Sequence, residues 1–348
     1  MFSSQLLTDL GWSNHFLGQL TEAELETTLP ARLTEVHRDR ASALTQDGPR
    51  DLNLLGGQST GDLAVGDWCL FDPETGRILR VLDRKSRLAR RAAGEVAREQ
   101  LIAANVDTAF LTTSCNADFN EARIERYLAL IHTGGIEPVI LITKSDLADD
   151  PQSFLDRVRN IAPKTVALAV NARDPAAASQ LSPWTGRGQT VCFLGSSGVG
   201  KSTLAVTLTG LNLATGAIRE DDAKGRHTTT NRALFRIPDG GWLIDTPGMR
   251  ELRLSDVSEG IEITFADLAD LERQCRFSDC KHEAEPGCAI QEAIAAGSLD
   301  PARLVRWQKL RREDQWNSAS VAELRSTARR FGKMTRNAGK HKRGWDTE

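Results

Sequence analysis

The residues from 195 to 202 are Gly195, Ser196, Ser197, Gly198, Val199, Gly200, Lys201 and Ser202. They follow the pattern G-x-x-x-x-G-K-(S/T), between an apolar strand candidate, Thr190–Leu194, and a helix candidate, Lys201–Leu208. In such a loop backbone amides and a helix N-terminus face phosphate groups, the lysine neutralises phosphate oxygens and the serine hydroxyl can ligate Mg²⁺. A glycine-rich turn without a ligand is the alternative, but the strand before and the helix after argue against it. The pattern predicts a phosphate loop at residues 195–202, with Thr203 as a further contact.

Two segments after the phosphate loop supply the remaining parts of a nucleotide switch. Asp245 ends the apolar stretch Trp242–Asp245, and Gly248 follows it. Asp245 can hold Mg²⁺ through a water, and the Gly248 amide can sense a γ-phosphate. The polar loop Gly225–Thr230, with the sequence GRHTTT, is long enough to close over the nucleotide and to supply Thr229 to the metal. The order of these parts predicts a switch-type nucleoside triphosphatase.

A base loop is predicted before the phosphate loop. The apolar stretch Pro138–Ile142 leads into Thr143, Lys144, Ser145 and Asp146. A carboxylate there can accept hydrogen bonds from guanine N1 and N2, and the lysine can pack over the base. Asn171 and Ala172, after the strand candidate Thr165–Val170, offer a backbone amide for guanine O6. An ordinary helix cap is the alternative interpretation of residues 143–146. If they do form a base loop, its position before the phosphate loop indicates a circular permutation, which moves the chain ends while each strand keeps its place.

The remaining sequence predicts several domains. From Val106 onward, apolar strand candidates alternate with amphipathic helix candidates, which favours an α/β domain with a mainly parallel sheet and helices on both faces. Short strand candidates at Ala31–Val36, Ala41–Leu44, Trp68–Phe71 and Ile78–Leu82 indicate a five-strand oligonucleotide/oligosaccharide-binding (OB) type β-barrel, although an SH3-like barrel fits almost as well. The basic segment Arg84–Arg91 after it is either a solvated linker or a phosphate contact.

Four metal-ligand side chains lie within fourteen residues near the C-terminus. They are Cys275, Cys280, His282 and Cys288. Three thiolates and one imidazole complete a tetrahedral Zn²⁺ site and leave no open position, which predicts a structural metal. Scattered core cysteines or a redox pair are the alternatives. The other three cysteines, Cys69, Cys115 and Cys192, lie in apolar surroundings that are typical of core thiols in a reducing compartment.

Length and charge set outer limits on the function. The chain has 348 residues, and no apolar run approaches the roughly 20 residues that a membrane helix needs. The start of the chain has no secretory signal pattern. The formal net charge of −3 conceals Arg325–Arg343, which holds eight Lys or Arg and no acid, so the remainder carries −11 (−3 minus 8). This basic tail favours RNA binding, with a solvated disordered tail as the alternative.

Taken together, these features resemble the circularly permuted GTPases of the RsgA (YjeQ) family over nearly the whole chain. The resemblance implies a monomeric, cytoplasmic GTPase that uses Mg²⁺, binds ribosomal RNA, acts in late maturation of the small ribosomal subunit and is activated by that subunit. Thr143 stands where the family usually has asparagine, which removes an amide that braces the phosphate loop, and Asn171 stands where serine is frequent. The expected domains are a flexible arm with one short helix (1–30), the barrel with its basic linker (31–100), the permuted GTPase domain (101–262) and a helical zinc-binding domain with the basic tail (263–348).

The hydrolytic residues are less clearly marked by the sequence. Met249 follows Gly248 where Ras-like enzymes place a glutamine that orients water, and this predicts slow intrinsic turnover and an activating partner. His227, with Lys201 and Thr229, is the expected catalytic set, although His227 could instead contact the partner. Loss of the γ-phosphate would then relax the segment after Gly248 and reorient the zinc-binding domain. An RNA-binding scaffold that only holds GTP and a GTPase that delivers metal are the alternative functions.

Overall fold

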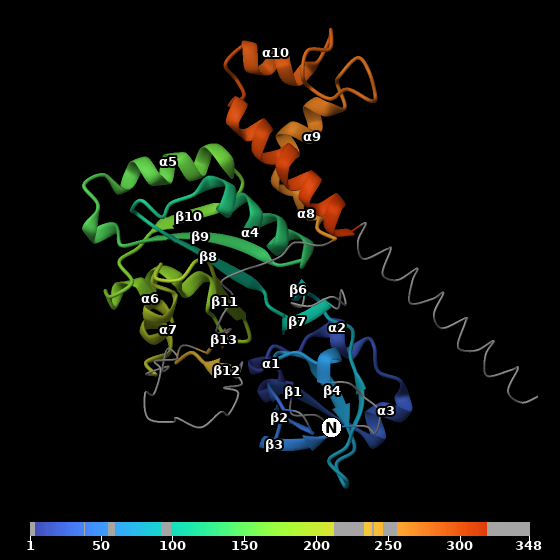
Figure 1. The fold of residues 1–348 in the computed structure, drawn as a ribbon. Coiled ribbons are helices and arrows are strands. Elements are labelled where there is room, and N and C mark those ends of the chain that lie inside the picture. Colours follow the sequence, from blue (N-terminus) through green and yellow to red (C-terminus); the bar gives the residue numbers. More distant parts are fainter. Residues whose placement is uncertain are drawn as a thin grey trace, which may run out of the picture.

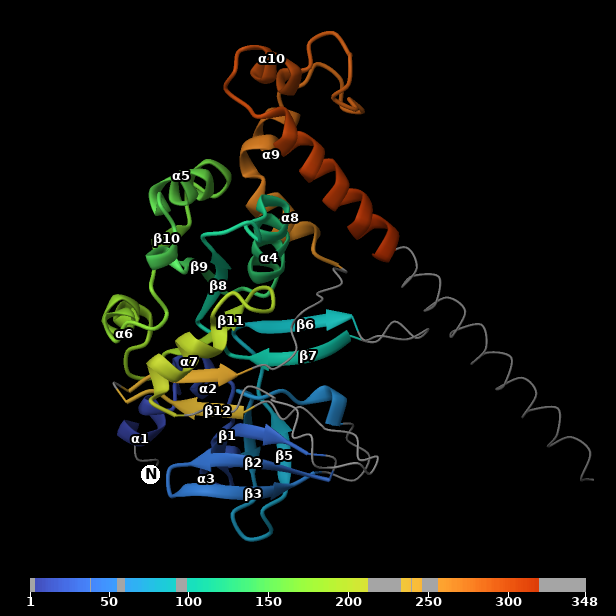
Figure 2. The same cartoon turned by 60° about the vertical axis from the view of Figure 1, so that its left-hand side comes forward.

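The structure is a computed structural model that describes residues 4–37, 39–54, 60–91, 99–211, 233–238, 240–245 and 256–318. Figures 1 and 2 show a β-barrel, a central sheet with helices on both sides, and a helical C-terminal module at the opposite end from the barrel. None of the helices within these ranges combines the length and apolar character required to span a membrane.

The barrel is a five-stranded antiparallel sheet in the order β3-β2-β1-β4-β5. Its elements are β1 (Leu29–Val36), β2 (Arg40–Thr45), β3 (Gly48–Asn53), η1 (Thr60–Asp62), β4 (Trp68–Phe71) and β5 (Ile78–Val81). A parallel bridge between Asn53 and Arg77 joins β3 to the start of β5, and the Asn53 amide donates to the Gly76 carbonyl at 2.9 Å. This bridge closes the sheet and confirms the OB-type barrel. Strand β3 is absent from the sequence prediction because its residues, GPRDLN, are mostly polar.

Residues 4–27 are packed against the rest of the molecule. They form α1 (Ser4–Asp9), α2 (Asn14–Leu17) and α3 (Glu22–Thr27). Leu7 and Phe16 are each only 1% exposed, and the Trp12 ring meets the Trp68 ring of the barrel edge to face, with centroids 4.8 Å apart. The prediction of a flexible arm with one short helix is therefore wrong, because these apolar side chains are buried in the main core.

The basic segment after the barrel is a strand. Residues of β6 (Arg87–Arg91) pair with β7 (Glu99–Ala104) in an antiparallel ribbon. Arg84 forms an ion pair with the fully buried Asp67 side chain, at 2.6 Å. Residues 87–91 of the segment expected as a linker therefore form paired strand, and the boundary expected at residue 100 falls inside β7.

A buried arginine ties the barrel to the central sheet. Arg32 of β1 donates to the Leu10 carbonyl at 2.5 Å and to the Thr190 hydroxyl at 2.7 Å, where β11 begins. Burial lowers the pKa of the Arg32 guanidinium to about 10, while Asp107 and Asp67 favour its charged form. The barrel is thereby fixed to the strand that leads into the phosphate loop.

The central sheet has six strands in the order β10-β9-β8-β11-β13-β12, all parallel except β12. The strands are β8 (Thr108–Ser114), β9 (Glu137–Thr143), β10 (Val166–Ala169), β11 (Thr190–Leu194), β12 (Ala233–Arg236) and β13 (Trp242–Asp245). The other elements are α4 (Glu121–Thr133), η2 (Ser145–Leu147), α5 (Pro151–Ile161), α6 (Ala176–Leu181), η3 (Ser182–Trp184) and α7 (Lys201–Thr209). Helices α4 and α5 cover one face, and α6 and α7 cover the other. The predicted mainly parallel sheet is confirmed.

The C-terminal module comprises residues 256–318. It contains α8 (Ser258–Thr264), α9 (Ala266–Glu272), α10 (Ala289–Ala295) and a final helical stretch over residues 301–318. Helix α8 approaches α4 so closely that a Cβ on Gly260 would lie 1.8 Å from the Ala129 carbonyl oxygen. The boundary expected at residue 262 therefore falls within a helix that packs on the domain of the central sheet.

Candidate functional site

The phosphate loop lies between β11 and α7, as the sequence predicts. Gly195, Gly198 and Gly200 have φ values of 135°, 77° and 98°, a region that side chains disfavour. A Cβ on Gly195 would lie 2.1 Å from the carbonyl oxygen of Thr112 on β8. Glycine is therefore required where the loop leaves the sheet.

Lys201 lies along the phosphate loop. Its ammonium donates to the Gly195 carbonyl at 2.8 Å and to the Ser196 carbonyl at 2.5 Å. Ser197, Gly198 and Ser202 are exposed to solvent. The loop thus exposes its backbone and the Ser202 hydroxyl to solvent, with the Lys201 ammonium close by. Backbone amides, a hydroxyl and a cation are the groups that bind a polyphosphate.

The base loop and the phosphate loop meet despite their reversed order in the chain. Strand β9 ends at Thr143, Lys144 follows with a φ of 59°, and Ser145–Leu147 forms the short helix η2. A Cβ on Gly200 would lie 3.5 Å from the Thr143 hydroxyl oxygen and 3.6 Å from the Ala172 Cβ. Both predicted base-contacting segments therefore border the phosphate loop.

Thr143 braces the phosphate loop through its hydroxyl. This oxygen lies 2.9 Å from the Thr113 carbonyl oxygen and 2.5 Å from the Val199 carbonyl oxygen, and its single proton serves one of them at a time. Thr143 is fully buried. Threonine lacks the amide, as the sequence indicates, but its hydroxyl reaches the Val199 carbonyl and supplies a brace of a different kind.

The segment after β10 also contacts α7. The Ala172 carbonyl accepts from the Thr207 hydroxyl at 2.9 Å, and the Asn171 side chain accepts from the Arg173 amide at 3.0 Å. Asp146 is exposed at the surface near Cys115, and burial together with the charge of Asp146 raises the pKa of the Cys115 thiol. Asp146 is therefore accessible to a ligand.

The switch residues are only partly described. Asp245 ends β13, next to β11, and is half-buried. Gly248, Met249, His227 and Thr229 lie outside the described residues, as does the basic tail Arg325–Arg343. Asp245 therefore reaches the predicted edge of the sheet, one strand from the phosphate loop.

The structure adds a residue that sequence reasoning missed. Arg123, in the first turn of α4, donates to the Ser196 hydroxyl at 2.5 Å and to the Asp118 carboxylate at 2.9 and 3.0 Å. No motif marks Arg123. The relevant signal is its position soon after β8, whose end lies beside the phosphate-loop strand β11.

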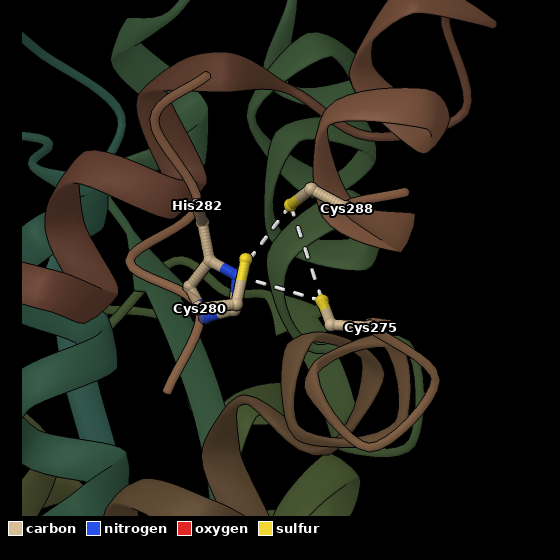
Figure 3. A group of neighbouring side chains, drawn as sticks. All are labelled: Cys275, Cys280, His282 and Cys288. Atoms are coloured by element: carbon tan, nitrogen blue, oxygen red, sulfur yellow. Dashed lines mark hydrogen bonds between the residues drawn. The ribbon is translucent and has the colours of Figure 1, made fainter. Parts of the chain in front are cut away.

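The four predicted metal ligands come together in the C-terminal module. Their donor atoms, on Cys275, Cys280, His282 and Cys288, all lie within 4.8 Å of one another, and the side chains point toward a common centre (Figure 3). The Cys275 and Cys288 sulfurs are 3.9 Å apart, and each is 3.6 Å from His282 Nδ1. Tetrahedral zinc with its usual bond lengths requires about 3.8 Å between sulfurs and about 3.6 Å between sulfur and nitrogen. The cluster could therefore hold a zinc ion.

A carboxylate orients the imidazole of this metal cluster. Glu272 Oε1 lies 3.4 Å from His282 Nε2 and 2.8 Å from the Arg311 guanidinium. This contact leaves Nδ1 of His282 directed at the thiols. Desolvation raises the pKa of the Cys280 thiol to about 11, and the neighbouring thiols of Cys288 and Cys275 add to the shift, so without a cation this thiol is protonated at neutral pH.

The sheet order, the phosphate loop and the base loop before it define the class of a circularly permuted GTPase. The model of the RsgA GTPase family matches residues 81–255. A Mesorhizobium japonicum protein named small ribosomal subunit biogenesis GTPase RsgA is 53% identical over 320 residues, which is 91% of this chain and 92% of the relative. A Vibrio parahaemolyticus protein with that name and the number 2 is 48% identical over 342 residues, or 98% and 95% of the two chains. The chain belongs to the RsgA GTPase family.

Solved structures agree with this fold. YjeQ from Thermotoga maritima superimposes with a TM-score of 0.61 at 24% identity, covering 81% of this chain and 97% of that one. YloQ, described as a circularly permuted GTPase, gives a TM-score of 0.59 at 22% identity, covering 83% and 95%. The permuted arrangement of strands predicted from the sequence is confirmed.

Proposed function

We propose that this chain hydrolyses GTP in a Mg²⁺-dependent reaction that the small ribosomal subunit activates during its late maturation. The observation that carries the proposal is the convergence of the base loop, the phosphate loop and Asp245 at one edge of the sheet. The close relatives are named as small ribosomal subunit biogenesis GTPases, which supports the choice of partner.

Each polar group at this edge has a proposed role. The base loop, residues 143–146, reads guanine, with Asp146 as acceptor and Lys144 over the base, and Asn171-Ala172 offers an amide to the guanine oxygen. Lys201 neutralises phosphate oxygens, and Ser202 with Asp245 holds Mg²⁺ directly or through water. Residues 195–203 surround the phosphates.

The catalytic assignment rests on the sequence alone. His227, with Thr229 as a metal ligand, is proposed to complete the site when the partner orders the loop around them. Met249 cannot position water as a glutamine would, so turnover without the partner is slow. Positioning by the partner then supplies what the chain lacks.

The metal cluster is proposed to hold one structural Zn²⁺ per chain. All four donors come from the protein, so no position remains for a substrate. His282 and Cys288 are buried. A complete set of four protein ligands, two of them buried and two half-buried, argues against a role in delivering metal to a client.

The partners are proposed from charge and from the relatives. The basic tail, Arg325–Arg343, suits RNA phosphates, and its +8 charge predicts binding that weakens steeply with salt. We infer a monomer in the cytoplasm that contacts ribosomal RNA of the small subunit. A GTP-holding scaffold without hydrolysis is not favoured, because the chain belongs to a GTPase family.

Adding purified small ribosomal subunits is expected to raise the rate of GTP hydrolysis at least tenfold over the protein alone. The reason is that the partner supplies the positioning that Met249 cannot. Phosphate release is measured with and without subunits, in Mg²⁺ and in EDTA, with Lys201→Ala as the inactive control. A rate that is equally low with and without subunits would support the scaffold alternative.

Thr143→Val is expected to weaken binding of GTP and GDP about five- to thirtyfold, because loss of the hydroxyl leaves the Val199 or Thr113 carbonyl unpaired at a cost of about 1–2 kcal/mol. Thr143→Ser keeps the hydroxyl and is expected to restore most of the affinity. Titration with a fluorescent guanine nucleotide measures both. Equal affinities for Thr143→Val and the unchanged protein would show that the brace has no role.

A further inference from the structure

Helix α4 makes a contact with the phosphate loop that the loop's own motif does not require. Arg123 bonds the Ser196 hydroxyl, while Lys201 bonds the Ser196 carbonyl. Two cations therefore hold the same residue, one at its side chain and one at its backbone. Because Ser196 is the second residue of the loop, this pair defines where the first half of the loop lies.

The position of Arg123 depends on polar contacts. Its side chain is 39% exposed and lines an open cavity of about 670 Å³, which Ser196, Arg306 and Lys309 also line. Apolar packing does not enclose the guanidinium there, so Asp118 and Ser196 hold it in place. An arginine held in this way is able to change partners when a phosphate arrives.

The same helix is anchored to the C-terminal module. Glu125, 1% exposed, accepts from Arg303 at 2.8 Å and from Arg306 at 2.6 Å. Arg303 also pairs with Asp267 at 2.9 Å and donates to two backbone carbonyls. Burial raises the pKa of Glu125, and the two arginines oppose the shift. Breaking such a pair is costly because it leaves a buried charge without a partner.

Backbone packing makes this anchor rigid. Gly260 of α8 lies against the Ala129 carbonyl of α4 with no room for a side chain. Arg126, beside Glu125, forms a further ion pair with Glu313 in the final helical stretch. The module and α4 are therefore expected to move as one body, so that a shift of the module shifts Arg123.

We propose that Arg123 is a positioning residue of the phosphate loop and that the C-terminal module sets its position through Glu125 and α4. The module then acts on nucleotide binding through Ser196 at the start of the loop, whereas the base loop borders Gly200 near its end. This adds a second route to the coupling expected through the chain after Gly248. The inference rests on the proposed nucleotide site.

Equilibrium titration of the full-length protein with fluorescent GTP and GDP analogues tests the first half of the proposal. Arg123→Met is expected to weaken binding about tenfold, Arg123→Lys less, and Ser196→Ala about threefold. The double variant Arg123→Met/Ser196→Ala is expected to bind like Arg123→Met, because each substitution removes the same Arg123–Ser196 contact. Arg159→Met, an ion-paired arginine on α5 that is more exposed than Arg123, is the control and is expected to bind like the unchanged protein.

Glu125→Gln tests the second half. It is expected to weaken nucleotide binding about threefold while the zinc content stays at that of the unchanged protein, and to add nothing to Arg123→Met. Additive losses, or an unchanged affinity in Glu125→Gln, would overturn the link through α4. An unchanged affinity in Arg123→Met would overturn the whole inference. Lys201→Ala distinguishes a failure of this inference from a failure of the proposed nucleotide site. If the unchanged protein binds GTP and Lys201→Ala does not, the nucleotide site is supported whatever the result for the Arg123 variants.

Discussion

Asp146→Asn is expected to weaken GTP binding at least a hundredfold. The carboxylate accepts hydrogen bonds from N1 and N2 of guanine, whereas the asparagine amide keeps one acceptor oxygen and places its NH2 donor against the other guanine donor. Sites built to hydrogen-bond a ligand reject a mismatched partner by factors of about 10⁴ to 10⁵. Asp146 is exposed in η2, so its replacement is not expected to alter the fold. Titration with a fluorescent GTP analogue measures the loss.

Xanthosine triphosphate sharpens this experiment. Its oxygen at C2 can accept from the asparagine amide, so Asp146→Asn is expected to prefer it to GTP, reversing the order of the unchanged protein. Asp149→Asn, three residues away and also exposed, removes the same charge and serves as the matched control. Unchanged GTP affinity in Asp146→Asn would remove the base loop from the proposed site.

Cys288→Ser is expected to release the metal from the cluster and unfold the C-terminal module. Structural zinc contributes about 10–16 kcal/mol of apparent binding free energy in small zinc-binding units, and that energy is lost when a ligand is lost. Cys288 is 2% exposed and is the N-cap residue of α10, so the hydroxyl of the serine would also be buried. Metal content by elemental analysis and hydrogen exchange over residues 256–318 measure the two effects.

Cys69→Ala is the matched control for this experiment. Cys69 is a fully buried thiol of the barrel, so its substitution leaves a small cavity but removes no metal ligand. It is expected to lower the thermal stability slightly and to keep the zinc. A Cys288→Ser protein with full zinc content would contradict the four-ligand site.

Local chemistry explains which predictions from the sequence are confirmed. The boundaries of β11 and β13 agree with the strand candidates because these strands are buried apolar runs. The metal cluster forms as expected because its spacing determines which side chains can meet. In both cases the residues that carry the signal are close together in the chain.

The errors share a physical cause. Strand β3 and strand β6 are polar or basic, and they become strands because neighbouring strands pair with their backbones. The N-terminal helices are too short to be stable alone, and burial of Leu7 and Phe16 stabilises them. Tertiary contacts outweighed local pattern in each of these segments.

By itself the sequence determined the parts of this GTPase: the phosphate loop, the base loop, Asp245 and the four metal ligands, each readable from residue type and spacing. Only the tertiary structure decided how they are connected. It places the Thr143 hydroxyl on the phosphate loop and Arg123 against Ser196, and it joins α4 to the C-terminal module through Glu125 and Arg303. These pairs are 56, 73 and 178 residues apart in the chain, so no local pattern records them. The order of strands in the sheet brings the first two within bonding distance, and the packing of the C-terminal module on α4 brings the third.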